Sequence, residues 1–230
     1  MPTRIRPCHV CVDGPLGQGS QVVAIVGDTV QTVPKLAFRG ALCHGVLTAL
    51  ERLPHGAAVL AAVAPEAVER IRRSGKLAWI PSDALAAINS AHLEIAGTEQ
   101  YLDFWRRYVV GSVDNGLYAA LFAGALRIFG RNPNGLLKWL GRSWELSSRG
   151  LGTVEVVPGM NECQIIVTEI PEVHRLVAIA LSTQGSVMGV LDVARHPREV
   201  TIDLTKLAAG SYTVLARWRE PSGSDTDPEP

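Results

Sequence analysis

Apolar positions follow two different periods along this chain of 230 residues. Between about residues 36 and 149 they recur every three or four positions, which predicts amphipathic helices. In 153–157 and 162–170 they alternate with polar positions, which is typical of strands that bury one face. The pattern therefore predicts a helical half followed by a strand-rich half.

Prolines and capping residues divide the helical half into segments. Helices are predicted to begin near Leu36, at Pro65, after Pro81 and at Thr98, which is a good N-cap. An aromatic stripe at helical spacing follows the last of these starts. We interpret this stripe as core packing; it consists of Tyr101, Phe104, Trp105 and Tyr108.

The stretch 115–150 connects the two halves. Leu117–Phe129 is apolar on two faces, which predicts a helix buried nearly all round, and Gly124 is expected to let another helix approach closely. Asn132-Pro133 then predicts a second helix, with an Asn N-cap and proline at the first helical position. A helix with two apolar faces needs partners on both sides, which favours one integrated domain.

The strand-rich half begins with a predicted hairpin around the turn at 158–161. The apolar segment Val173–Leu191 predicts a helix, in which Gly185 and Gly189 allow close packing. Two more strands, Glu199–Leu204 and Ser211–Trp218, follow it. The order β-β-α-β-β predicts a four-stranded antiparallel sheet with helices on its apolar face, and thus an α+β fold.

The domain boundaries follow from composition. Residues 1–20 contain several glycines and are predicted to be a flexible lead-in, and 220–230 are predicted to be a disordered acidic tail. The range 21–219 is predicted to be a single domain, with its helical half at about 36–149 and its sheet half at about 151–219.

The charge balance narrows the range of partners. With 22 basic and 22 acidic side chains, the chain lacks the positive field that nucleic-acid binding requires. A neutral chain also has little charge repulsion between copies, so we expect a homodimer. No signal peptide and no membrane-spanning segment is predicted, and four cysteines fit the reducing cytoplasm.

Several short strings support a family resemblance. The order of helices, hairpin, helix and hairpin resembles that of haem nitric-oxide-binding sensor domains and four-vinyl-reductase-type ligand-binding domains. The strings at 38–40, 125–130 and 137–142 are similar to a myxobacterial paralogous family of uncharacterised proteins. The resemblance covers about residues 35 to 218 and implies a sensing or interaction module, often dimeric. Haem nitric-oxide sensors carry a Tyr-x-Ser-x-Arg string, which this sequence lacks.

A ligand pocket is expected between the 117–129 helix and the sheet. Its candidate lining residues are aromatic side chains of the two helices around residue 131: Tyr118, Phe122, Phe129, Trp139 and Trp144. Cations near the helix start at Asn132, where free amide groups favour anions, form a candidate anion site: Arg131, Lys138 and Arg142. A solvated helix face is the alternative for these cations.

The cysteines leave several interpretations open. Cys8 and Cys11 form a C-x-x-C pair, but Val12 occupies the position where haem attachment requires histidine. Three interpretations of this pair stay open: two ordinary thiols, a redox couple, or half of a zinc site that Cys43 and His44 complete. His44 and His92 fall in predicted helices and are candidate axial haem ligands, with a satisfied core histidine as the alternative.

Catalytic motifs are scarce: there is no Gly-x-Ser-x-Gly elbow, His-Glu-x-x-His pair or phosphate loop. The sequence therefore favours a non-catalytic cytosolic module that senses a small molecule or binds a signalling protein, without a cofactor. One alternative is a metal- or thiol-dependent enzyme that uses the N-terminal cysteines. Another is a haem-binding gas sensor.

Overall fold

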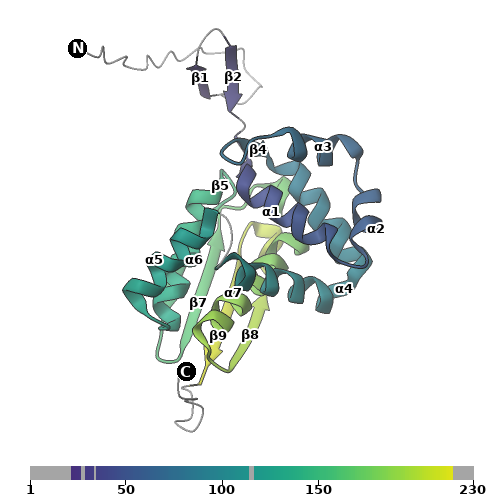
Figure 1. Cartoon of the computed structure of the whole chain (residues 1–230). Coiled ribbons are helices and arrows are strands. Elements are labelled where there is room, and N and C mark those ends of the chain that lie inside the picture. The colour runs from purple at the N-terminus through teal and green to yellow at the C-terminus, as the bar shows by residue number, and fades with distance from the viewer. Residues whose placement is uncertain (1–21, 27–28, 34, 114–116, 220–230) are drawn as a thin grey trace, which may run out of the picture.

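The computed structural model describes residues 22–26, 29–33, 35–113 and 117–219 (Figure 1). The expected lead-in at 1–20 and tail at 220–230 lie outside these residues. Two strands, β1 (Val22–Val26) and β2 (Thr29–Val33), pair antiparallel. The helical half then consists of β3 (Ala37–Arg39), α1 (Gly40–Glu51), α2 (Gly56–Ala61), α3 (Pro65–Arg73), β4 (Trp79–Pro81), α4 (Ser82–Ser112), α5 (Leu117–Phe129), α6 (Pro133–Ser147) and β5 (Ser148–Arg149).

The sheet half contains the predicted β-β-α-β-β unit, which confirms the α+β fold class. Its four strands are all antiparallel, in the order β6-β7-β9-β8. Alternate residues of β7 and β9 are buried, so one face of the sheet is covered. The elements are β6 (Thr153–Pro158), β7 (Glu162–Thr168), the 3₁₀ helix η1 (Glu172–His174), α7 (Val177–Ala194), β8 (Arg198–Asp203), η2 (Leu207–Ala209) and β9 (Tyr212–Trp218).

Helix α7 joins the two halves, because it packs between the sheet and α4. A side-chain carbon at Gly185 would lie 2.7 Å from Trp105 Cβ, and one at Gly189 would lie 2.5 Å from the Arg106 carbonyl oxygen. The close packing predicted for these two glycines is therefore confirmed. Arg106 also forms an ion pair across the contact, 2.8 Å from Asp192 of α7.

Helix α7 is the one helix in the described residues that is long and apolar enough to cross a membrane, and 61% of that segment is buried inside the fold. Its beginning differs from the prediction. Residues 172–174 form a separate 3₁₀ turn, and the helix itself starts at Val177. The segment from Pro171 to Leu176 therefore links β7 to α7 as a short irregular connection.

Helix α4 changes direction at Gly97, where the backbone adopts φ 75° and ψ 167°. This break stands directly before Thr98, where the sequence predicts a new helix. Tyr101, Phe104 and Trp105, from the stripe that follows, are all at least 94% buried, which confirms their role as core residues. Gly97 allows the break because a positive φ favours glycine.

The beginning of α1 corrects the sequence prediction. Residues 37–39 form a strand, and the helix starts at Gly40 instead of near Leu36. The strand pairs with β4 on one side and with β5 on the other, so it links chain segments more than a hundred residues apart. Phe38 is thereby buried in the core, 3% exposed, edge-on to Trp144.

Helix α5 has the predicted bounds but is not buried nearly all round. Ile128 is 70% exposed and Phe129 is 41% exposed, while Ala125 is fully buried. The close approach expected at Gly124 is also wrong, since a side-chain carbon there would have no neighbour within 4 Å. Although α5 is apolar on two faces, it is only partly buried, because it packs mainly against α6 at the edge of the molecule (Figure 1).

The restart at Asn132 is confirmed. The Asn132 side chain accepts a hydrogen bond from the Gly135 amide at 3.2 Å, and Pro133 is the first residue of α6. Phe129 packs over Gly135, where a side-chain carbon would lie 2.6 Å from Phe129 Cβ. The start of α6 is thus fixed both by a cap and by the end of α5.

Candidate functional site

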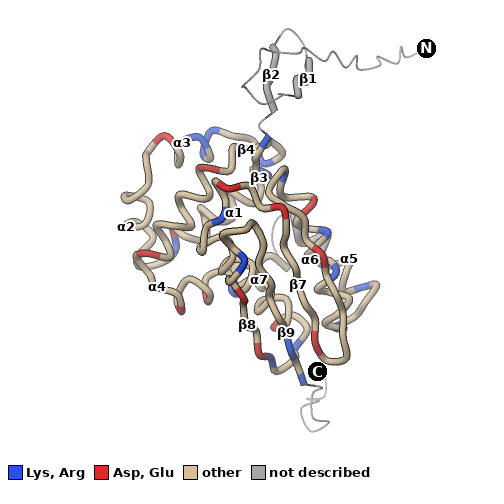
Figure 2. Tube along the Cα trace, turned by 180° about the vertical axis from the view of Figure 1, so that it is seen from behind, with Lys and Arg blue, Asp and Glu red and all other residues tan. Residues whose placement is uncertain are grey.

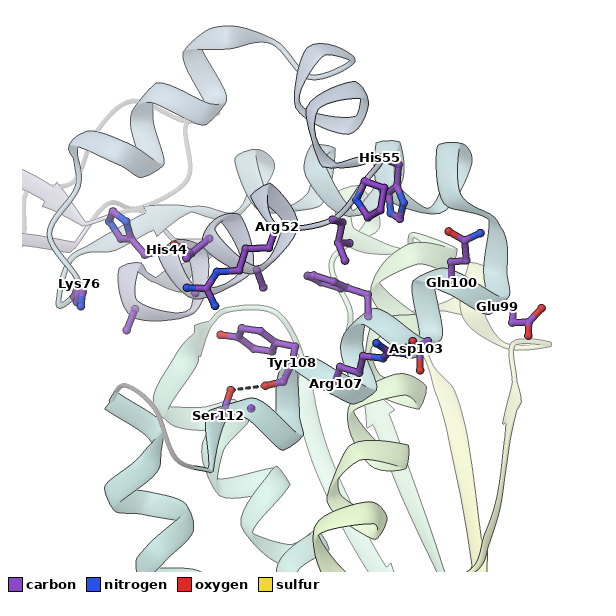
Figure 3. Close-up of a pocket in the computed structure, with 18 residues that line it drawn as sticks. His44, Arg52, His55, Lys76, Glu99, Gln100, Asp103, Arg107, Tyr108 and Ser112 are labelled. Carbon is purple, nitrogen blue, oxygen red and sulfur yellow. Dashed lines mark hydrogen bonds and ion pairs between the residues drawn. The ribbon is translucent and has the colours of Figure 1, made fainter.

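A wide groove separates α1 from the part of α4 that follows Gly97 (Figure 3). Its volume is about 1030 Å³, which is at the upper end of the ~300–1,000 Å³ that small-molecule sites occupy. Small residues of α1 line the groove: Ala41, Gly45, Thr48 and Ala49. The Tyr108 hydroxyl occupies the space that a side chain at Gly45 would fill. From the opposite wall the groove is lined by Phe104 and Tyr108 of α4.

Charged side chains line the groove as well. In Figure 3, His44, Arg52 and Lys76 lie toward one end, and Gln100 and Glu99 toward the other. Arg107 forms an ion pair with Asp103 at 2.6 Å. The two ends of the groove therefore differ in charge. The trace in Figure 2 shows basic and acidic residues spread over the rest of the molecule, without one dominant sign.

Two histidines meet near the groove: His55 from the turn between α1 and α2, and His92 from α4. His55 Nε2 lies 3.1 Å from His92 Nε2, so one ring donates a hydrogen bond to the other. His92 is 1% exposed, and burial together with the nearby His55 lowers the pKa of His92 to about 4. The inner histidine is therefore neutral near pH 7. His44 Nε2 instead lies 2.7 Å from the Ser74 carbonyl oxygen, to which it donates.

A second, smaller hollow lies where the helical half meets the sheet half. This junction pocket has a volume of about 120 Å³. Its walls come from α4, α6 and α7, with single contributions from β3, α1, α5, β6 and β7. Tyr108 and Ser112 line both the groove and the junction pocket, so the two hollows share a wall.

The hydroxyl groups of the junction pocket present acceptors. Ser143, Ser147, Ser182 and Ser186 each donate to a backbone carbonyl three or four residues earlier in the same helix. With its hydrogen used in this way, each hydroxyl retains only lone pairs for another partner. The pocket is thus mainly apolar, with hydrogen-bond acceptors at fixed points.

Trp105 contributes a hydrogen-bond donor instead of an acceptor. It is 5% exposed, lines the junction pocket, and its indole N–H has no hydrogen-bond partner among the described residues. Burial raises the pKa of Tyr101, and interactions of its hydroxyl with the Trp105 indole N–H and with Ser182 oppose part of that rise, so the N–H lies near the Tyr101 hydroxyl, although not in the geometry of a formed hydrogen bond. A buried donor without an acceptor costs about 1–3 kcal/mol.

The structure brings only some of the predicted pocket residues to this hollow. Phe122 and Trp144 line it, whereas Phe129 and Trp139 do not. The side chain of Tyr118 lies outside the described residues. In this hollow α5 contributes Phe122 alone, while α4, α6 and α7 form most of the wall, and a ligand pocket between α5 and the sheet stays a prediction.

The predicted anion residues do not converge on either hollow. Arg131, Lys138 and Arg142 are all exposed, and Arg142 lies 3.8 Å from Glu145. None of the three lines the groove or the junction pocket. An anion site at the start of α6 stays a prediction.

The cysteine and histidine candidates separate in the structure. Cys8 and Cys11 lie outside the described residues. Cys43 is 1% exposed in the core, where burial raises the pKa of its thiol to about 12, whereas His44 lines the groove. Within the described ranges no three His, Cys, Asp or Glu side chains gather in a way that could hold a metal ion. A zinc site that combines Cys43 and His44 with Cys8 and Cys11 stays a prediction.

The groove and the location of Trp105 were missed at the sequence level. Their residues come from elements that are distant along the chain, and no motif marks them. The aromatic stripe was the one available signal, and it indicates burial without distinguishing a core side chain from one that lines a cavity.

Comparison with known proteins identifies the fold. No protein-family profile and no curated protein matches the sequence. Among solved structures, an Fe(II) unliganded H-NOX protein from K. algicida is similar, with a TM-score of 0.56, 10% identity, and coverage of 79% of this chain and 97% of that one.

Two further structures agree with this comparison. A point mutant of the K. algicida protein gives a TM-score of 0.58 at 10% identity, with 80% and 97% of the two chains covered. An oxygen-binding H-NOX domain related to soluble guanylate cyclases gives 0.50 at 14% identity, with 80% and 96% covered. The resemblance to the myxobacterial family stays a prediction. This chain therefore has the fold of the H-NOX structures.

Proposed function

We propose that this chain is a sensing domain that binds a small, uncharged, mainly apolar molecule in the junction pocket. The unpaired indole N–H of Trp105 is the observation that carries the proposal, because it offers a buried donor beside an apolar space. The walls contain no Lys, Arg, Asp or Glu among the described residues. An ion there would lack a counter-charge, which disfavours charged ligands.

The size of the pocket limits the ligand. At about 120 Å³ it is similar to an engineered cavity of about 150 Å³ that binds benzene. The ligand class is therefore a molecule of about benzene size, with one acceptor for Trp105. The pocket is formed by both halves of the fold, so an occupant would contact α4 and α7 at once and bias how they pack.

Two probes of similar shape test the proposal. Cyclohexanone carries a carbonyl acceptor, and methylcyclohexane does not. We expect both molecules to raise the melting temperature of the wild-type protein. Trp105→Phe should lower the affinity for cyclohexanone about fivefold, which corresponds to the loss of one hydrogen bond of about 1 kcal/mol. The affinity for methylcyclohexane should stay the same.

Trp139→Phe is the matched control, because the indole N–H of Trp139 is also buried and unpaired but does not line the pocket. This variant should bind both probes as the wild type does. Absence of binding by the wild-type chain, or equal weakening by the two Trp→Phe variants, would overturn the proposal.

Haem is the second candidate, because the similar structures include Fe(II) and oxygen-binding H-NOX proteins. The residues of the junction pocket do not fit it. A pocket of about 120 Å³ is smaller than drug-sized sites, and no described His, Cys or Met lines it. Tyr108 is the one described residue there of a type that holds haem iron, and its hydroxyl lies against Gly45 of α1.

The histidines elsewhere do not replace that donor. The Nε2 atoms of His44, His55 and His92 are all engaged, that of His44 with the Ser74 carbonyl oxygen and those of His55 and His92 with each other. His174 is buried, and its Nδ1 has no partner among the described residues, but the void beside it holds only about 10 Å³, the space of one water molecule. Incubation with haem decides between the candidates: a Soret band at a stoichiometry of one would favour haem over the proposed small ligand.

A further inference from the structure

The groove between α1 and α4 contains two cations that the fold itself does not neutralise. Neither the Arg52 nor the Lys76 side chain makes a hydrogen bond or an ion pair within the described residues, and both line the groove. Both are exposed, and Figure 3 shows the Arg52 guanidinium directed into the groove, toward the end with His44 and Lys76.

Other cations of the same region are neutralised by acidic side chains. Five arginines of α3 and α4 each form an ion pair with a carboxylate: Arg70, Arg72, Arg73, Arg106 and Arg107. The missing partners of Arg52 and Lys76 thus do not reflect a shortage of acids nearby. Among the described residues, the positive end of the groove remains without a counter-charge.

The rest of the groove is suited to an apolar chain. Phe104 and Tyr108 stack in parallel, with an interplanar angle of 20°, and both rings line the groove. Opposite them, Ala41 and Ala49 carry short side chains, and Gly45 makes room for the Tyr108 hydroxyl. Glu99 lies at the other end, where its charge would repel a carboxylate and so fix the direction of a bound anion.

We propose that this groove binds an amphipathic monocarboxylate of fatty-acid type. The carboxylate would pair with Arg52, and the chain would lie over Phe104 and Tyr108. Lys76, next to the start of α1, would add to the positive potential at this end of the groove. The volume of about 1030 Å³ accommodates such a molecule, which the junction pocket of about 120 Å³ does not. The proposal is independent of the small uncharged ligand proposed above.

Calorimetric titration of the full chain with decanoate and with decanol tests it. Decanol has a similar chain without the charge. We expect the double variant Arg52→Gln/Lys76→Gln to lower the affinity for decanoate at least tenfold and to change the affinity for decanol by less than twofold. Added salt should weaken decanoate alone, because exposed charge pairs are screened. Trp105→Phe should change neither.

Arg127→Gln/Lys138→Gln is the matched control, since it removes the same charge from exposed positions outside the groove. Thr48→Trp should fill the groove from an exposed position of α1 and block both probes. The proposal is overturned if the wild-type chain does not bind decanoate, if both double variants weaken it equally, or if Thr48→Trp leaves binding intact.

Discussion

His92 shows how a single side chain can make this fold sensitive to acid. It is enclosed by the rings of Tyr101 and Phe104, and His55 is its one polar partner among the described residues. Protonation would place a charge in this apolar setting, and both burial and the nearby His55 disfavour that charge. The folded state therefore holds His92 in its neutral form.

The pKa of His92 predicts the pH dependence of stability. In the unfolded chain a histidine titrates near 6.5, whereas folding lowers the pKa of His92 to about 4. The unfolded state therefore binds an extra proton between these values. The contribution to stability is full above about pH 6.5 and is lost as the pH falls to about 4, in total about 3 kcal/mol.

Urea unfolding at several pH values measures this effect. His92→Gln should be less stable at neutral pH, but its free energy of unfolding should change less between about pH 6.5 and about pH 4.5 than that of the wild type. Parallel curves for the two proteins would show that His92 does not cause the dependence.

At the scale of elements, the crossing of α4 and α7 depends on two glycines. A methyl group at Gly189 would lie 2.5 Å from the Arg106 carbonyl oxygen and 2.7 Å from Val109 Cβ. Neither neighbour can rotate away, because one is backbone and the other is at the start of a side chain. We expect Gly189→Ala to destabilise the protein by about 1–3 kcal/mol in chemical denaturation.

Gly124→Ala provides the contrast. Gly124 also lies within a helix, but a methyl group there would meet nothing within 4 Å. Since alanine favours helix over glycine, this variant should be more stable by about 0.5–1 kcal/mol. If both substitutions had the same sign, packing would not be the cause of the difference.

The start of α6 gives a third prediction. Asn132→Ala removes the acceptor for the Gly135 amide and should lower the free energy of unfolding by about 1 kcal/mol. Asn132→Asp keeps an acceptor at this position and adds a negative charge that the helix N-terminus favours. It should therefore retain the wild-type stability, and a loss equal to that of alanine would contradict the capping role.

At the scale of the whole molecule, the sequence indicated the elements better than their arrangement. The hairpin around 158–161, the restart at Asn132 and the break before Thr98 are local events, and capping or turn residues mark each of them. The strands at 37–39, 79–81 and 148–149 were missed. They have two or three residues each, which is too short for a period to be visible.

The hollows were less predictable than the elements for a different reason. The junction pocket takes Phe38, Trp105, Trp144 and Ser182 from four separate elements, so its shape depends on tertiary packing. Phe122, Phe129 and Trp144 were all selected because they are aromatic, but of these three described residues only Phe122 and Trp144 line this pocket. Periodicity indicates which face is apolar, but not which apolar residues border an empty space.

The division of the core between α4 and α7 has a practical consequence for dissection of the protein. A fragment with residues 35–113 would carry α4, and one with residues 117–219 would carry α7 and the sheet. Each fragment would expose the surface that the other covers, so the two should reassemble by complementation when mixed, as measured by size-exclusion chromatography.

Gly189→Leu should prevent this association, and recovery of a complex from fragments that carry this substitution would contradict the expectation. Both fragments supply walls of the junction pocket. A molecule that binds there should therefore raise the affinity of the fragments for each other, so that complex formation detects a ligand of the pocket.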